Sequence, residues 1–171
     1  MDYKALIREV PDFPKPGVLF YDITTLLKDA KALQTVTDAL TDRYQAQGIA
    51  KVVGIESRGF IMGGTLATRL RAGFVPVRKP GKLPADLYEV KYNLEYGSSS
   101  LAIHRDAIEI GEKVLVVDDL LATGGTAAAT VHLIRQLGGE IAALDFLVEL
   151  KSLGGRERLT GYNIHSMIVY P

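Results

Sequence analysis

The segment from Val114 to Thr126, VLVVDDLLATGGT, constrains the fold more than any other part of the chain. Its first four residues, Val114–Val117, are apolar and β-prone, which predicts a strand buried on both faces, as in a parallel sheet. Two carboxylates follow, then a small glycine-containing loop, and then a helical pattern over Ala127–Leu137. Strand, loop and helix in this order form half of a βαβ unit. In such sheets, ligands bind beyond the carboxyl ends of the strands.

The loop that begins at Ala122 has the residues of an anion site. Gly124 and Gly125 allow the main chain to turn sharply and to approach a ligand closely. The first turn of the predicted helix leaves N–H groups free at the positive end of its dipole. Thr123 and Thr126 add hydroxyl donors. The loop therefore predicts a cradle for a phosphate group.

Asp118 and Asp119 lie at the predicted end of the strand, directly before this loop. Ionised carboxylates only accept hydrogen bonds, so their natural partners are pairs of hydroxyl groups or a divalent cation. A phosphate site beside a hydroxyl-pair site describes a ribose 5-phosphate. The alternative is an ordinary turn with two solvated acids. This alternative is less favoured because the two acids are adjacent and lie between a buried strand and a Thr-Gly-Gly-Thr turn.

The spacing of residues in the chain excludes two other kinds of glycine-rich phosphate loop and one other kind of site with paired aspartates. No G-x-G-x-x-G follows the strand, and no G-x-x-x-x-G-K-[ST] occurs in the chain, which removes the dinucleotide fingerprint and the usual P-loop. A response-regulator receiver domain also starts with a strand ending in two aspartates. It needs a longer series of strands and helices than the residues after Asp118 provide.

The composition predicts one globular domain over residues 1–171, because this length buries one core but is short for two domains. Lys and Arg together number 20, as do Asp and Glu, so no basic surface for nucleic acid is expected. No apolar run approaches the roughly 20 residues of a membrane helix. The absence of cysteine fits a reducing cytoplasm, and the first residues lack the plan of a signal peptide.

The remaining pattern predicts further strands and helices. Strands are expected at Lys51–Ile55, Phe74–Val77, Tyr88–Leu94, Ser100–His104, Ile141–Val148 and Ile164–Tyr170. Helices are expected at Tyr3–Val10, at Phe60–Ala72 and from Asp29, as N-cap, to Gln47. The three histidines lie far apart in the sequence and are interpreted as structural or surface residues.

Two loops at predicted strand ends carry cations. Ser57 and Arg58 offer N–H groups and a guanidinium to an anion, although this loop taken alone is more simply a turn. Arg78, Lys79 and Lys82 follow the next predicted strand, between prolines. In a chain without net charge, such a cluster is a reasonable pyrophosphate clamp, and a solvated loop is the alternative.

The segment VVDDLLATGGT resembles the phosphoribosyl-pyrophosphate (PRPP) binding motif of the type I phosphoribosyltransferases, and in detail that of their adenine-specific branch. The segment PGVLFYDIT at 16–24 is similar to the base-binding segment of that branch, and LEYG at 94–97 to its catalytic loop. The resemblance covers nearly the whole chain. It implies an α/β fold with a mostly parallel twisted sheet flanked by helices, a small N-terminal hood and a flexible hairpin lid.

The resemblance also implies the reaction, a Mg²⁺-dependent transfer of the 5-phosphoribosyl group from PRPP to adenine, giving AMP and pyrophosphate. Asp118 and Asp119 would hold the ribose hydroxyls and Ala122–Thr126 the 5-phosphate, with Mg²⁺ held through PRPP and water rather than by protein ligands. The expected pyrophosphate-binding residues are Ser57, Arg58, Arg78, Lys79 and Lys82. The enzyme is expected to be a homodimer, in which Arg78 or Lys82 acts in the neighbouring subunit's site.

The base site is implied by the same resemblance. The ring of Phe20 would sandwich adenine, although composition alone favours a core role for this residue. Backbone groups near Leu19 would read the edge of the base, beside Arg58 and Ala122. Glu95 would handle the purine proton, and Tyr96 lies on the same lid.

Two other functions remain open at this stage. A related enzyme acting on a 6-oxopurine such as xanthine would share the PRPP site and differ in the base site. A PRPP-sensing transcription regulator on the same fold would need an added DNA-binding module and a basic surface, which the sequence lacks.

Overall fold

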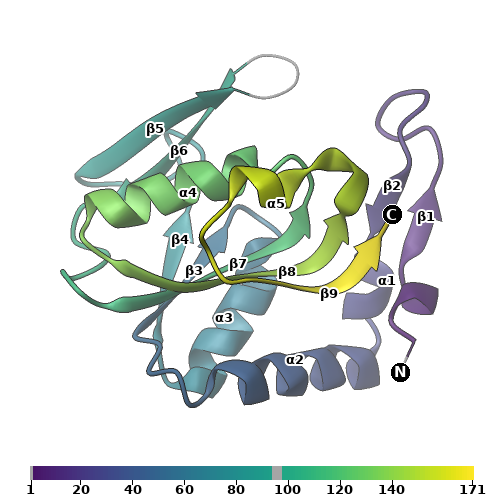
Figure 1. The fold of residues 1–171 in the computed structure, drawn as a ribbon, viewed down its shortest axis with the longest axis horizontal. Coiled ribbons are helices and arrows are strands. Elements are labelled where there is room, and N and C mark those ends of the chain that lie inside the picture. Colours follow the sequence, from purple (N-terminus) through teal and green to yellow (C-terminus); the bar gives the residue numbers. More distant parts are fainter. Residues whose placement is uncertain (1, 94–97) are drawn as a thin grey trace.

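The computed structural model describes residues 2–93 and 98–171. Its centre is a five-stranded sheet in the order β4-β3-β7-β8-β9, and every neighbouring pair is parallel (Figure 1). The strands are β3 (Lys51–Ile55), β4 (Gly73–Val77), β7 (Lys113–Leu121), β8 (Glu140–Leu150) and β9 (Ile164–Tyr170). The predicted α/β class with a parallel sheet is confirmed.

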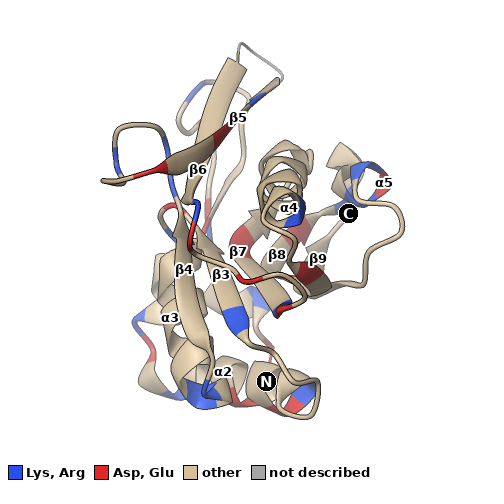
Figure 2. Ribbon diagram, turned by 90° about the vertical axis from the view of Figure 1, so that its left-hand side faces the viewer, with Lys and Arg blue, Asp and Glu red and all other residues tan. Residues whose placement is uncertain are grey.

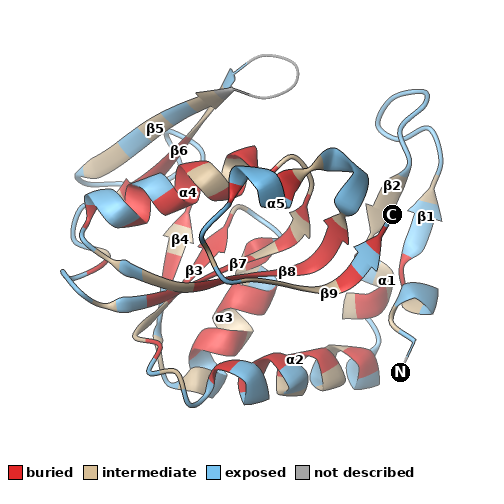
Figure 3. Ribbon diagram, in the orientation of Figure 1, coloured by how far each residue is buried: buried red, intermediate tan, exposed pale blue. Residues whose placement is uncertain are grey.

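Helices cover both faces of this sheet. In Figure 1, α2 (Ala30–Tyr44) and α3 (Gly59–Leu70) lie on one face, and α4 (Gly125–Gln136) and α5 (Gly155–Arg158) on the other. Strand β7 contributes side chains to both faces of the sheet, because successive side chains of a strand point in opposite directions. Leu115 and Val117 pack in the core with α2 and α3, whereas Val114 and Val116 pack in the core with α4. Figure 3 shows the strands of the sheet buried between these layers.

Helix α2 forms where the sequence predicts it, because Asp29 caps its first turn. The Asp29 carboxylate accepts a hydrogen bond from the Ala32 N–H at 2.8 Å. Val36, Leu40 and Tyr44 recur at helical spacing and are all buried in the core. The helix ends at Tyr44, three residues before the predicted end at Gln47.

Two pairs of antiparallel strands lie outside the central sheet. The strands β5 (Leu87–Asn93) and β6 (Ser98–His104) form a hairpin that lies over α4 (Figure 1). At the N-terminus, β1 (Arg8–Val10) pairs with β2 (Phe20–Asp22). The helix predicted over Tyr3–Val10 was therefore wrong beyond its first turn. A 3₁₀ turn, η1 (Lys4–Leu6), comes first, and the next residues gain more by pairing with β2 than by continuing a helix. The short elements α1 (Thr24–Leu27) and η2 (Lys151–Leu153) complete the fold.

The strand β7 is longer than its apolar run predicts. Its pairing with β3 ends at Val117, but its pairing with β8 continues to Leu121, opposite Glu149. The predicted end of the strand before Asp118 was therefore wrong, because the longer neighbour β8 keeps the backbone extended. Asp118 and Asp119 lie within the strand, beyond its pairing with β3.

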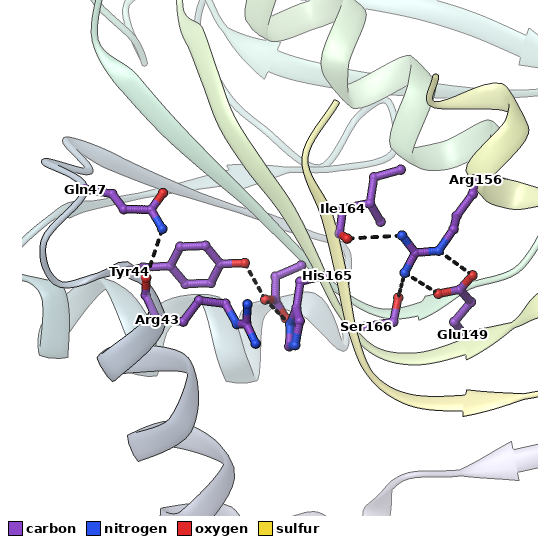
Figure 4. Close-up of polar contacts among 9 residues, drawn as sticks. Arg43, Tyr44, Gln47, Glu149, Arg156, Ile164, His165 and Ser166 are labelled. Carbon is purple, nitrogen blue, oxygen red and sulfur yellow. Dashed lines mark hydrogen bonds and ion pairs between the residues drawn. The ribbon is translucent and has the colours of Figure 1, made fainter. Parts of the chain in front are cut away.

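A buried polar cluster joins α2 to β8 and β9 (Figure 4). Asp145 is 1% exposed and accepts a hydrogen bond from the Tyr44 hydroxyl at 2.6 Å, while His165 Nδ1 lies 2.8 Å from the same carboxylate oxygen. Burial, together with the charge of Asp145, raises the pKa of Tyr44 far above its ordinary value. His165 thus has a structural role, as the sequence indicates.

Charged residues of both signs are interspersed along the ribbon (Figure 2), in keeping with equal totals of acidic and basic residues. Arg69 and Asp38, for example, pair across the surface between α3 and α2. Among the described residues, no helix combines the length and the apolar character that crossing a membrane requires.

Candidate active site

A cavity of about 490 Å³ opens at the carboxyl ends of β3 and β7. This is the edge at which parallel α/β sheets bind ligands. The cavity brings together both predicted acids, part of the glycine loop and the loop that follows β3. Its lining residues are Glu56, Ser57, Arg58, Lys79, Asp118, Asp119, Leu120, Ala122 and Thr126.

The predicted phosphate loop forms a second, smaller hollow of about 70 Å³ beside the first. The residues from Ala122 to Thr126 all line it, together with the start of α4. Gly124 has a φ of 77°, in the left-handed region, and Gly125 begins the helix. The free N–H groups of the first helical turn therefore lie at this hollow, which suits one phosphate group.

The two acids lie in a tightly packed part of the site. Asp119 is 7% exposed, and its N–H donates to the Asp118 carboxylate at 2.9 Å. A side chain at Gly59 would meet this pair, since an added Cβ would lie 2.9 Å from Asp118 Oδ1. Burial, and then the charge of Asp119, raise the pKa of Asp118 well above its ordinary value. Arg58 stands opposite, with its Nε 2.5 Å from Asp119 Oδ2.

Arg58 also borders a third cavity, of about 420 Å³, between the N-terminal segment and the loop that follows β3. Val10, Phe13, Phe20, Asp22, Ile23 and Thr24 form the rest of its wall. The guanidinium carbon of Arg58 lies 5.6 Å from the centre of the Phe20 ring, which Phe13 contacts edge-on at 5.1 Å. The wall is therefore largely apolar and aromatic, with one cation and one carboxylate, and suits a flat heterocycle.

Two residues predicted to contact the base do not line this third cavity. Leu19 is 42% exposed, next to Phe20 in the chain, and Ala122 lines the two hollows around the phosphate loop instead. Phe20 and Arg58 are the predicted base-site residues that the structure brings together here.

The basic loop after β4 is held by Glu56, a role that the sequence analysis did not assign to this residue. The Glu56 carboxylate accepts hydrogen bonds from Arg78 Nε at 3.2 Å and from the Lys79 N–H at 3.0 Å. Burial would raise the pKa of Glu56, but these hydrogen bonds and the nearby cations lower it overall. Lys79 reaches the large cavity, whereas Arg78 turns to Glu56 and to the Lys82 carbonyl at 3.1 Å. A carboxylate directly before Ser57 was the available signal.

The predicted lid residues Glu95 and Tyr96 lie outside the described part of the chain. The described part of the same hairpin does reach the phosphate loop. The Tyr92 hydroxyl, on β5, lies 3.3 Å from the Thr126 hydroxyl.

The described residues contain no group of three or more His, Cys, Asp or Glu side chains placed to hold a metal ion. The adjacent carboxylates of Asp118 and Asp119 are oxygen donors of the kind that Mg²⁺ prefers.

Comparison with known proteins identifies the family. The family model of the phosphoribosyl transferase domain matches residues 22–160. The adenine phosphoribosyltransferase of Acidobacterium capsulatum is 61% identical over 167 residues, which cover 98% of this chain and 92% of that protein. The crystal structure of the adenine phosphoribosyltransferase from Thermoanaerobacter pseudethanolicus superposes with a TM-score of 0.94 at 50% identity, covering 98% and 97% of the two chains.

A more distant relative has been solved with a ligand. The Giardia lamblia enzyme, complexed with 9-deazaadenine, superposes with a TM-score of 0.94 at 38% identity, covering 99% of this chain and 97% of that one. Together with the acid pair, the phosphate loop and the aromatic cavity, these comparisons settle the family. The chain belongs to the phosphoribosyl transferase family and, within it, to the adenine phosphoribosyltransferases.

Proposed function

We propose that this chain transfers the 5-phosphoribosyl group of PRPP to adenine, releasing pyrophosphate and giving AMP. The observation that carries the proposal is the position of Arg58. Its side chain lines both the polar cavity with the acid pair and the aromatic cavity with Phe20. A sugar phosphate in the first and a base in the second would therefore meet beside Arg58. The Giardia lamblia relative was solved with an adenine analogue, which supports the choice of base.

Different residues of the polar cavity and the adjoining hollow bind different parts of PRPP. The loop Ala122–Thr126 binds the 5-phosphate through N–H groups and hydroxyls. Asp118 and Asp119 accept hydrogen bonds from the two ribose hydroxyls. During the reaction the bond from C1 to the pyrophosphate oxygen breaks while a bond to an adenine nitrogen forms. Positive charge develops on the ring, and the nearby carboxylates stabilise it.

The leaving pyrophosphate is received at the other end of the cavity. Ser57, Arg58 and Lys79 line this region, and the loop that carries Lys79 also contains Arg78 and Lys82. Mg²⁺, bound through PRPP and water, supplies further neutralisation of the phosphate charge.

Four further features are part of the proposal. The β5–β6 hairpin closes over the site as a lid, and Glu95 transfers the purine proton. Closure excludes water, which protects PRPP from hydrolysis. The β1–β2 pair acts as a hood over the base. Residues 1–171 act as one catalytic domain in the cytoplasm. Two copies form a dimer in which Arg78 or Lys82 reaches the active site of the other copy. This part of the proposal is supported by the position of both residues, which lie beside the large cavity of their own chain and do not line it.

The test is an assay with one base at a time. Purified protein, PRPP and Mg²⁺ are mixed separately with adenine, hypoxanthine, guanine and xanthine, and nucleotide formation is followed. AMP formation from adenine alone, dependent on Mg²⁺, is expected. Turnover of an oxopurine alone would overturn the assignment of the base site. Binding of PRPP without any turnover would point to a sensor rather than an enzyme.

A further inference from the structure

Arg156, on the short helix α5, connects this part of the chain to the sheet through its guanidinium (Figure 4). Its guanidinium makes two hydrogen bonds of 2.7 Å to the Glu149 carboxylate, in the bidentate arrangement that Arg and carboxylates favour. It also donates to the Ile164 carbonyl at 3.1 Å and to the Ser166 hydroxyl at 3.2 Å. Arg156 therefore fixes α5 against the ends of both β8 and β9.

The residue before Arg156 is in direct contact with the phosphate loop. Gly155 is buried, and a Cβ added to it would collide with the Ala122 carbonyl and lie 2.8 Å from the Leu121 side chain. From the other side, a Cβ added to Gly124 would lie 2.6 Å from the Gly155 carbonyl oxygen. Main chain thus packs on main chain, and the first residue of α5 forms the back of the loop.

We propose that Arg156 is a positioning residue for PRPP, which acts through Gly155 to hold the loop Ala122–Thr126 in the shape that binds the 5-phosphate. This inference rests on the proposed function of that loop. Arg156 itself lines none of the three cavities of the site, so it acts without touching the substrate. The loop binds phosphate mainly through N–H groups, and such hydrogen bonds weaken steeply when the donor moves or turns away.

The Arg156 contact depends on the shape of the guanidinium as well as on its charge. Glu149 is 3% exposed, so its charge needs a partner of good geometry. A lysine would keep the positive charge but not the planar fork that reaches Glu149, Ile164 and Ser166 together. Arg156→Lys therefore loosens α5 without leaving a buried charge unpaired, which makes it the informative variant.

Ribose 5-phosphate is the probe, because it occupies the phosphate loop and the ribose site without adenine or pyrophosphate. For Arg156→Lys we expect its dissociation constant, measured by calorimetry, to rise about tenfold, which corresponds to about 1.4 kcal/mol. The KM for PRPP should rise in parallel, while the KM for adenine stays within about twofold. Arg158→Lys is the matched control, since Arg158 lies exposed on the same helix and its side chain makes no hydrogen bond or ion pair with the described residues.

A second variant approaches the same contact from its other side. Glu149→Gln keeps the shape of the Arg156 partner and removes its charge, so the same selective loss of ribose 5-phosphate affinity is expected, to a smaller extent. Unfolding curves establish that each variant is folded at the assay temperature.

The outcomes separate the two proposals. Failure of the wild-type chain to bind ribose 5-phosphate would refute the proposed function. If the wild type binds ribose 5-phosphate and the folded Arg156→Lys variant binds it with the same dissociation constant, the proposed role of Arg156 is overturned. An equal rise in the KM for adenine would also overturn it, because a general loosening of the fold would affect both substrates. Failure of both variants to fold would do the same, since a positioning role requires the fold to survive the change.

Discussion

Arg58 and Asp119 form an ion pair across the active site, with Nε 2.5 Å from Oδ2. The same guanidinium faces the Phe20 ring at 5.6 Å, so one side chain joins the carboxylate assigned to the ribose with the aromatic wall assigned to the base. If Asp119 binds the ribose hydroxyls as proposed, these hydroxyls would compete with Arg58 for its oxygens. Binding of PRPP would then affect the position of a residue in the base cavity.

Asp119→Asn is expected to weaken PRPP binding by at least about tenfold, because the amide gives up an acceptor charge that contributes about 1.5–3 kcal/mol to such a hydrogen bond. The dissociation constant for PRPP in the presence of Mg²⁺ measures the effect. Asp106→Asn, at an exposed position, serves as the control. PRPP affinity equal to that of the wild type would refute the ribose assignment.

Phe20→Leu tests the base cavity. Stacking of a base on an aromatic ring contributes about 1–3 kcal/mol, so the KM for adenine should rise roughly tenfold, while PRPP affinity changes little. Steady-state kinetics with each substrate varied in turn distinguishes the two. If Phe20→Leu lowers the stability of the protein but leaves both KM values unchanged, Phe20 has a role in packing alone.

Glu95→Gln tests the proton transfer that the family resemblance implies for a residue outside the described chain. Loss of a general acid or base lowers turnover by about 10²–10⁴-fold, so kcat should fall far more than adenine affinity. Glu89→Gln, an exposed change in the same hairpin, is the control. If only the affinity for adenine fell, Glu95 would be a residue that reads the base.

The ion pair of Glu149 with Arg156 predicts a dependence of stability on acid. The hydrogen bonds from Arg156 lower the pKa of Glu149 below its ordinary value of 4.5, despite the opposing effect of burial. A carboxyl group with a lowered folded pKa stabilises the protein fully above its unfolded pKa, and loses this contribution as the pH falls through the folded value. The free energy of unfolding should therefore decline below about pH 4.5.

In Glu149→Gln this part of the decline should disappear, and the variant should be less stable than the wild type at neutral pH. Urea unfolding at a series of pH values measures both effects. Glu140→Gln, an exposed change at the other end of β8, should retain the wild-type slope. A wild-type slope in Glu149→Gln would show that other carboxyl groups cause the decline.

Much of the fold and part of the site follow from local pattern. The strands Lys51–Ile55 and Ile164–Tyr170 were predicted with their observed bounds, since an apolar run between turn residues marks both ends. The large cavity likewise unites Asp118, Asp119 and part of the glycine loop, because parallel strands end at a common edge.

The features that the sequence did not reveal depend on partners distant in the chain. Strand β7 continues past Val117 because β8 pairs with it, and β1 forms because β2 is available. The holding roles of Glu56 and Arg156 are not indicated by a local pattern. Each becomes informative only when its hydrogen-bond partners, Arg78 and Glu149, are brought beside it.

The contact between Gly124 and Gly155 limits how this enzyme can change. Both surfaces are main chain, so there is no side chain at either position whose replacement could tune the fit. Any substitution there adds atoms where none have room. A mutation that adjusts how the loop and α5 fit together therefore has to act from outside this contact, for example at Arg156 or at its partners Glu149 and Ser166 in β8 and β9.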